Sequence, residues 1–398
     1  MQVMEKQKLK IHMCDYPRDR MKRNLYLLLS LLLCLPLSAQ QTCRTRVVDS
    51  ETGEPVSYAT VCPSSGSRVM TNAEGDFYMQ TASGDTLYIS RIGYESLRIA
   101  AAQVGGRIAL RPLSKTLKTV TVTPVTTEEI LKRTLRRMRK EYNHNKNIWS
   151  MFFFRSTIHG KVKTRIQEGY MKARSAGNLR QTSVVSAKRF VEGETGRESY
   201  LHSTNIHRLL ELGARIKDSK FWQTAVTPLD NYKRYDYSHH ITMEGEDSQL
   251  LYKIDFPYME RANLMVGERQ AICGSLYIDA VTYRLMRFEG MVLGMYLKSY
   301  VMAEPSDLFF DIEYRHDNSF TEVSHIVIHG GNDETRFQVS LFNLGLLEEK
   351  TERGVKLGEN LLNAIDEAGD DSGIREKYEI ILRTEEEEKI FIKGMEAM

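Results

Sequence analysis

The sequence lacks the motifs that identify a hydrolase or a metal enzyme. No histidine is followed by a glutamate three positions later, and neither H-E-x-x-H nor G-x-S-x-G occurs in the chain. The sequence therefore gives no support for the histidine-glutamate zinc ligands of a zinc peptidase or for the nucleophile turn of an α/β-hydrolase. Cysteine is scarce, with five in 398 residues and no C-x-x-C pair, which argues against a cysteine zinc site. We predict no catalytic residue, no metal ligand and no cofactor.

A few residues remain that folding could gather into a site. His325 and His329 are four apart and would share one face of a strand. Strand histidines are more commonly packing or surface residues. The other candidates are the adjacent His239 and His240, the thiol of Cys273, and the carboxylates of Asp307 and Asp311, which could serve a glycosidase only if they faced a cleft.

The chain also lacks a strong net charge and a long hydrophobic run. It holds 55 Lys and Arg against 52 Asp and Glu, so nothing in the balance indicates a nucleic acid partner. Its longest apolar run, residues 25–37, is shorter than the ~20 residues that a spanning helix needs. Residues 21–39 are predicted to be a signal peptide that is cleaved after Ala39, because they combine a basic start, this apolar run and the small residues Ser38-Ala39. Residues 1–20 are then an over-long start, and we expect export to the periplasm or the outer membrane.

An exported chain can form disulfides, and Cys43 and Cys62 flank the first turn. Cys43 shares a face with Val47, whereas Cys62 is out of phase with Ala59 and Val61. The alternation therefore leaves open whether the two thiols are bridged.

Residues 41–113 carry short alternating segments separated by turn sequences. Thr52-Gly53-Glu54-Pro55, Asn72-Ala73-Glu74-Gly75 and Ser83-Gly84-Asp85 break the apolar alternation, and Gly93-Tyr94 closes the block. Such spacing predicts an antiparallel β-sandwich of about 70 residues. It resembles the carboxypeptidase regulatory-like domain of exported Bacteroidetes proteins, with Thr71-Asn72 in place of the usual Thr-Asp. The resemblance implies a prealbumin-like fold and an envelope location, with little about chemistry.

A linker over residues 114–126 leads to a predicted amphipathic helix over residues 127–146. Thr126 and Glu129 have the spacing of a capping box. One face of the helix is apolar, with Leu131, Leu135, Met138 and Tyr142 in a stripe. The other faces hold Lys132, Arg133, Arg136, Arg137, Arg139 and Lys140. These cations either contact acidic lipid headgroups or form the solvated face of a docked helix, and we favour the second.

Residues 147–346 predict a second, mainly β domain. Strand-like segments occur at 149–155, 250–256, 274–278, 283–288, 308–314, 323–329 and 335–342, and a helix is expected between 190 and 235. The helix followed by the aromatic run 152–155 resembles the second module of the same envelope proteins. The run G-S-L-Y-I-D-A-V-T-Y-R-L-M-R-F-E resembles hairpins of periplasmic lipoprotein-carrier half-barrels, which implies acyl chains held against a curved sheet.

The tail, residues 347–398, is charge-rich. Residues 358–368 and 374–382 predict short helices or a final strand. Glu385 to Glu388 form a like-charge block that we expect to be solvated.

Three functions follow for a mainly β, α+β envelope protein. The leading hypothesis is non-catalytic binding or scaffolding, with the sandwich as the module that meets a protein partner. The alternative is a lipid or apolar-ligand carrier, which requires a cavity lined by residues such as Phe152, Phe154, Leu276, Ile278 and Leu285. The least favoured is an unrecognised hydrolase. The sequence indicates neither the ligand nor the oligomeric state.

Overall fold

The fold is that of a computed structural model, in which Gln41–Met398 form one compact unit. The structure describes residues 40–65, 68–82, 84–112, 125–145, 147–160, 163–174, 180–193, 238–244, 249–256, 271–295, 306–317, 320–331, 335–347, 353–356, 361–378 and 381–396. The expected signal peptide, most of the linker and the helix expected between 190 and 235 lie outside these ranges. No helix within them is long and apolar enough to cross a membrane.

The front of the chain forms a sandwich of two small sheets, as the turn spacing predicts. Their strands are β1 (Gln40–Asp49), β2 (Thr60–Pro63), β3 (Val69–Met70), β4 (Asp76–Ala82), β5 (Thr86–Ser90), β6 (Leu97–Ala100) and β7 (Arg107–Leu110), and a short 3-10 helix, η1 (Ala101–Gln103), precedes β7. The sheet orders are β4-β1-β7 and β3-β2-β5-β6. One pairing differs from the antiparallel prediction, because β1 and β7 run parallel.

Alternating apolar residues fill the space between the two sheets. Ala59, Val61, Phe77 and Met79 are fully buried in the sandwich core. Gly75 adopts a left-handed backbone, φ +77°, and a Cβ there would lie 2.4 Å from the carbonyl oxygen of Val47. Glycine is therefore required at the predicted turn position.

The two cysteines of the sandwich are not bridged in the described part of the chain. The Cys43 thiol is buried and lies 3.7 Å from the Thr81 hydroxyl. Cys62 is only partly buried, in agreement with its being out of phase with the core positions. The structure thus places the two thiols in different surroundings, one inside the sandwich core and one only partly buried.

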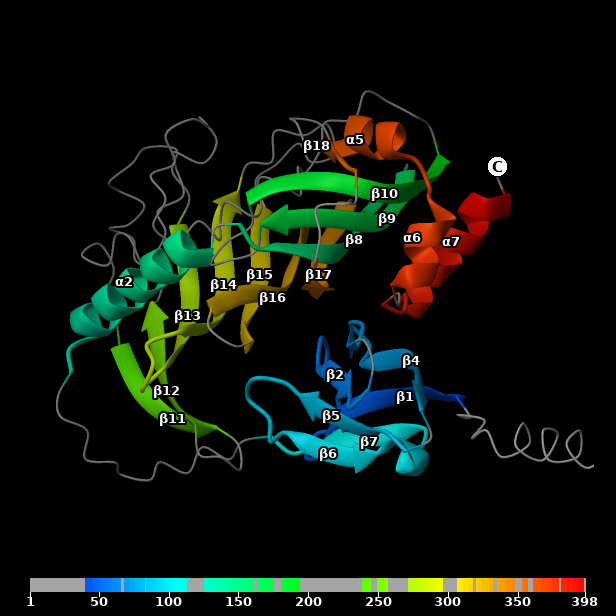
Figure 1. Cartoon of the computed structure of the whole chain (residues 1–398). Coiled ribbons are helices and arrows are strands. Elements are labelled where there is room, and N and C mark those ends of the chain that lie inside the picture. Colours follow the sequence, from blue (N-terminus) through cyan, green and yellow to red (C-terminus); the bar gives the residue numbers. More distant parts are fainter. Residues whose placement is uncertain are drawn as a thin grey trace, which may run out of the picture. The chain divides into compact units, whose positions relative to one another are not determined.

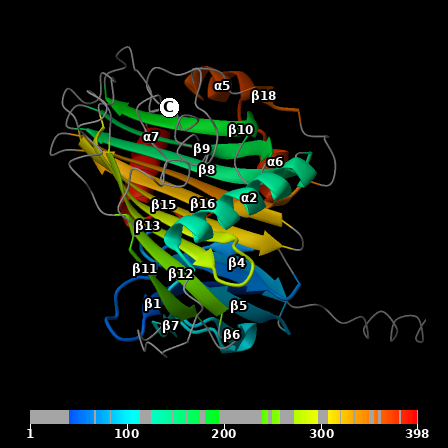
Figure 2. The ribbon, with the colours of Figure 1, turned by 90° about the vertical axis from the view of Figure 1, so that its left-hand side faces the viewer.

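The second module is built on one eleven-stranded sheet (Figure 1, Figure 2). Its strands are β8 (Trp149–Gly160), β9 (Lys163–Arg174), β10 (Arg180–Gly193), β11 (Ser238–Glu244), β12 (Gln249–Phe256), β13 (Ala271–Asp279), β14 (Leu285–Met295), β15 (Ser306–Asp317), β16 (Phe320–Gly331), β17 (Thr335–Leu346) and β18 (Val355–Lys356). Their order is β11-β12-β13-β14-β15-β16-β17-β8-β9-β10-β18, with antiparallel pairing throughout. The mainly β, α+β fold class is confirmed.

The best predicted hairpin forms, but its second strand begins two residues late. Tyr283 has a left-handed backbone, φ +58°, and belongs to the turn rather than to β14. The Asp279 carboxylate accepts hydrogen bonds from the backbone N–H groups of Val281 and Thr282. This bonding stabilises a turn over residues 280–284, between the two strands.

The expected helix is α2 (Thr127–Asn145), and the Thr126 hydroxyl accepts a hydrogen bond from the Glu129 backbone N–H. Leu131, Leu135 and Met138 are buried as the stripe predicts. The side chain of Tyr142 lies outside the described part.

Strand alternation gives the sheet two different faces. The face that we call the α2 face carries an apolar cluster shared with α2. The opposite face, the sandwich face, carries Phe153 and Val327, which pack with Met70 of the sandwich. The two modules are therefore joined through one side of the sheet.

The described part of the tail contains the helices α5 (Leu361–Ala368), α6 (Ser372–Lys377) and α7 (Glu385–Glu396). The expectation that Glu385 to Glu388 are all solvated is wrong, because Glu387 is buried and lies within ion-pair distance of Arg155. The Glu387 carboxylate accepts from the Thr384 N–H, and the Thr384 hydroxyl accepts from the Glu387 N–H. This is a capping box, and four acidic residues in a first turn also complement the helix dipole.

Candidate functional site

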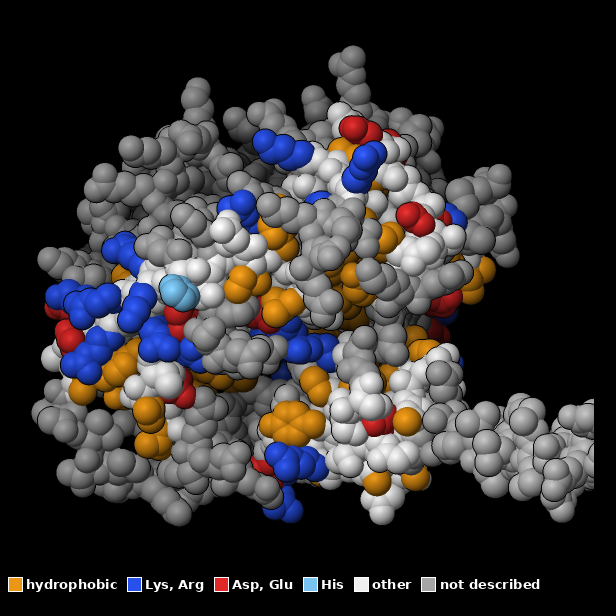
Figure 3. Space-filling model, in the orientation of Figure 1, with side chains coloured by type: hydrophobic (Ala, Val, Ile, Leu, Met, Phe, Trp, Pro, Cys, Tyr) orange, Lys and Arg blue, Asp and Glu red, His pale blue; other side chains and the backbone are white. Residues whose placement is uncertain are grey.

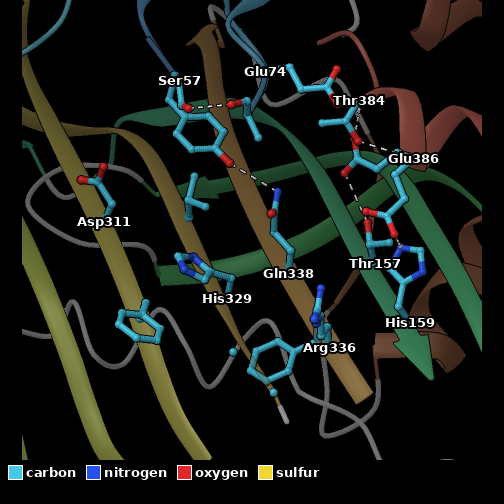
Figure 4. A pocket seen from close by; sticks show the side chains of 18 residues that line it. Ser57, Glu74, Thr157, His159, Asp311, His329, Arg336, Gln338, Thr384 and Glu386 are labelled. Atoms are coloured by element: carbon cyan, nitrogen blue, oxygen red, sulfur yellow. Dashed lines mark hydrogen bonds and ion pairs between the residues drawn. The ribbon is translucent and has the colours of Figure 1, made fainter. Parts of the chain in front are cut away.

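A cleft of about 980 Å³ lies where the sandwich, the sandwich face of the sheet and the start of α7 meet. The sandwich contributes the loops that hold Tyr58 and Glu74, and α7 contributes Glu386. Strands β8, β15, β16 and β17 form the floor. Figure 4 shows side chains from these elements around one cleft, with His329 and Arg336 on the floor side and Glu74 and Glu386 near α7.

The local backbone explains how the sandwich enters this cleft. Tyr58 has φ +59°, a conformation uncommon for a bulky residue. Its loop is held by Thr71, whose hydroxyl donates to the Val56 carbonyl and accepts from the Ala59 N–H. The Tyr58 ring consequently packs 5.9 Å from the ring of His325 on the sheet.

An exposed aromatic pair lies on the floor. Phe309 of β15 and His329 of β16 are directly paired across the two strands. Their rings stack with centroids 5.1 Å apart and planes 9° apart, and 41% of Phe309 is exposed. The surrounding cleft keeps part of the solvent away from His329, and this desolvation lowers the pKa of its imidazole, which is neutral at pH 7.

A buried ionic network joins the modules beside the cleft. Arg91 follows β5 in a tight turn that Gly93 allows with φ +95°. Its guanidinium bonds Asp311 and Glu313 of β15 at 2.5 Å each, and it lies 3.2 Å from Nε2 of His325. Arg91 is a sandwich residue surrounded by sheet residues, so the network fixes the contact between them.

The pKa values in this network follow from burial and from the two arginines. Burial would raise the pKa of Asp311, but Arg91 and Arg287 outweigh it and hold that pKa well below its usual range. Asp311 lines the cleft with both carboxylate oxygens bonded to arginine, so it carries no proton for acid catalysis. Burial raises the pKa of Glu313 and, together with Arg91, lowers that of His325 to about 3.

A second buried network fixes α7 against the sheet. Arg155 of β8 bonds Glu168 of β9, Glu387 of α7 and the backbone carbonyl of Ile381. Arg383 also bonds Glu168. Burial raises the pKa of Glu168, but Arg155 and Arg383 outweigh burial and leave that pKa below its usual value.

The five residues expected to line an apolar cavity all lie in the cluster on the α2 face. Phe152, Phe154, Leu276, Ile278 and Leu285 are buried there. Most of the described buried members of the cluster come from strands, and α2 and α5 supply Ile130, Leu131, Leu135, Met138, Ala364 and Ile365.

One polar group interrupts this apolar cluster. Tyr314 is 2% exposed, and its hydroxyl has no hydrogen-bond partner in the described ranges. Burial raises the pKa of this phenol. A buried hydroxyl without a partner is costly and uncommon.

The basic side chains of α2 gather on its outer surface (Figure 3). Lys132, Arg133 and Arg137 each form an ion pair with an acid four residues away on the same helix. Arg133 also donates to the Tyr283 hydroxyl. These pairs favour the interpretation of a solvated face on a docked helix.

The remaining sequence candidates do not form one site. His325 is buried in the Arg91 network, whereas His329 is exposed in the cleft. The side chains of His239, His240 and Asp307 lie outside the described part, and Cys273 is only partly buried. Within the described ranges, no group of three His, Cys, Asp or Glu side chains is arranged to hold a metal ion. The sequence analysis did not identify Arg91. The one sequence signal for it is its position after Ser90, in the turn before Gly93.

No family model matches the chain, and no curated protein matches it. Among solved structures, an outer membrane lipoprotein-sorting protein domain from Vibrio parahaemolyticus is 11% identical, with a TM-score of 0.26, 56% of this chain covered and 93% of that one. A DUF1329 family protein from Desulfovibrio piger is 11% identical, with a TM-score of 0.25 and coverages of 56% and 92%. MucB in complex with MucA(peri) is 8% identical, with a TM-score of 0.16 and coverages of 58% and 100%. These scores are too low to establish a shared fold.

Proposed function

We propose that this chain is a non-catalytic binding protein of the cell envelope that holds an apolar ligand, such as an acyl chain, on the α2 face of its sheet. The envelope location rests on the signal-peptide pattern of residues 21–39. The observation that carries the ligand is Tyr314, a hydroxyl without a described partner inside an apolar cluster. An acyl ligand brings both methylene groups for the cluster and a polar end for this hydroxyl.

The energetics favour such a ligand. Each methylene transferred from water to an apolar site contributes about 0.8 kcal/mol. A carboxylate or ester oxygen that accepts from Tyr314 would also remove the cost of burying that hydroxyl, about 1–3 kcal/mol.

A ligand on this face must displace protein side chains, and α2 is the helix placed to give way. Its described hydrogen bonds to the sheet include those from Arg133 to the Tyr283 hydroxyl and from Arg284 and the Thr321 N–H to Glu141, and a ligand that displaces α2 would break them. Met138, on its buried stripe, is a flexible side chain that adapts to a changed neighbour.

Native mass spectrometry of the chain purified from the periplasm tests the proposal, together with a titration by the fluorescent fatty acid cis-parinaric acid. We expect a retained lipid mass and saturable binding of the probe. Tyr314→Phe should lower the affinity about tenfold, the equivalent of one hydrogen bond.

Tyr277→Phe is the matched control, because Tyr277 is on the opposite face of β13 from Ile278 and donates to Glu289. It should bind the probe as the wild type does. A clean apo mass without probe binding would contradict the proposal, as would equal affinities of the two variants.

The alternative is scaffolding through the sandwich. Its loops around Tyr58 and Asn72 already contact the sheet and the segment before α7. A protein partner would therefore meet other parts of the sandwich, where Tyr78 and Tyr88 are exposed. Cross-linking from a residue placed at Tyr88 would identify such a partner, and a clean apo mass would put this function first.

A further inference from the structure

We propose that the cleft between the sandwich and the eleven-stranded sheet binds a neutral saccharide. The cleft is on the sandwich face, so this site is separate from the apolar-ligand site and does not depend on it. Neither module forms it alone, since its walls come from the sandwich, the sheet and α7.

The size of the cleft suits an oligomeric small molecule. Its volume of about 980 Å³ is at the upper end of the range of about 300–1,000 Å³ for ligand pockets in proteins. A chain of a few sugar rings fills such a volume better than a single metabolite does.

The floor offers the aromatic surface that a sugar ring needs. Phe309 is an apolar ring left 41% exposed on a sheet, and it stacks on the exposed His329. The face of an aromatic ring is electron-rich and attracts the slightly positive C–H groups on one face of a pyranose. His329 fixes the orientation of the Phe309 ring.

The polar groups around this floor are of both hydrogen-bonding kinds. Arg336 is exposed and only donates, Glu386 is 76% exposed and only accepts, and Gln338 does both. His159 lies 3.9 Å from Glu386 (Figure 4). Sugar hydroxyls donate and accept, so they can use every one of these groups.

Charge and pairing disfavour other ligands. Glu74 and Glu386 stand in the same cleft as Arg336, so a phosphate or nucleic acid would meet repulsion. An extended peptide that adds a strand needs an unpaired edge. Strands β15, β16, β17 and β8 are interior strands of the sheet and are paired on both sides.

Two experiments on the full chain test this site. The labelled protein is screened on a glycan array, and the saccharide that gives the strongest response is then titrated by calorimetry. We expect saturable binding. Phe309→Ala and Arg336→Ala should each weaken it at least tenfold. Tyr88→Ala, which removes a similarly exposed ring from the sandwich, should leave the affinity unchanged.

Unfolding midpoints measured in urea show that each variant is folded, which the exposure of Phe309 and Arg336 leads us to expect. Absence of binding to every glycan would overturn the proposal, and so would an affinity that Phe309→Ala does not change. Binding of a pentalysine peptide that Phe309→Ala weakens, without saccharide binding, would assign the cleft to basic peptides instead.

Discussion

Arg91 of the sandwich and Glu313 of the large sheet form an ion pair at 2.5 Å in which neither side chain is more than 11% exposed. The two residues are 222 positions apart in the chain. The sandwich is thus joined to the sheet by a buried charge pair as well as by apolar contact.

Replacing Arg91 by alanine should destabilise the protein by about 3–5 kcal/mol, since Glu313 would be left buried with its charge uncompensated. Urea unfolding measures this change. Arg46→Ala is the control, because Arg46 forms an ion pair with Asp76 on the sandwich surface, where such pairs contribute about 0–1 kcal/mol. Equal losses in the two variants would show that the Arg91 pair does not join the modules.

The contact of α7 with the sheet should depend on Glu387 and not on its neighbour. Glu387→Gln removes the charge opposite Arg155 and weakens the capping box, with an expected loss of about 2–4 kcal/mol. Glu386→Gln changes a side chain that is 76% exposed and should cost little. Hydrogen exchange of the α7 amides distinguishes them: only Glu387→Gln should speed exchange.

The stability of the folded protein should decrease as the pH falls, because of His325. Its pKa in the folded protein is about 3, and in an unfolded chain it is about 6.5. Between these values the unfolded chain binds the proton that the folded state rejects, so stability is lost as the pH falls below about 6.5.

When the pH is lowered from 7 to 5, we expect the free energy of unfolding of His325→Phe to rise by about 2 kcal/mol relative to that of the wild type. The facing groups Arg91, Asp311 and Glu313 remain in both proteins. Burial raises the pKa of Glu313, so this residue makes the folded state more stable as the pH falls, the opposite of His325. Because Glu313 is present in both proteins, its contribution cancels when the variant is compared with the wild type. A difference independent of pH would contradict a neutral His325.

Tyr314→Phe should stabilise the delipidated protein by about 1 kcal/mol, since it removes a buried hydroxyl without a described partner. Tyr277→Phe should instead destabilise it, because Glu289 loses a donor at 2.7 Å. Thermal unfolding of the two variants gives opposite shifts if the Tyr314 hydroxyl is unsatisfied. A loss of stability in Tyr314→Phe would mean that the hydroxyl has a partner in the apo protein.

Periodicity predicted the strands whose two faces differ in polarity. The predicted segments 250–256 and 335–342 contain alternating runs, residues 252–256 and 337–341, and they lie within β12 and β17. β9 was missed because Arg165, Gln167 and Glu168 are buried polar residues within it. Glu168 is bonded by Arg155 of the neighbouring strand and by Arg383 of the tail, and no local pattern reveals these partners.

The cleft was unpredictable for the same reason. His329 was a sequence candidate only as a metal ligand, and Phe309 was one of many aromatic residues. Their stacking depends on the register of β15 with β16. The acidic block 385–388 was misinterpreted because a run of like charges normally indicates a solvated segment. The burial of Glu387 depends on the capping Thr384 and on the buried Arg155, and the folded structure is needed to see the second of these.

The strand order has a consequence for how the chain assembles. β8 lies between β9 and β17, and its contact with β17 joins residues 185 positions apart, Arg155 and Ser340. Non-local pairings of this kind are slow to form. Until β17 has been synthesised, β8 has one unpaired edge, and an unpaired edge can bind another chain. The middle of the sheet therefore pairs late in folding, and its open edge is the place where a wrong strand pairing would begin.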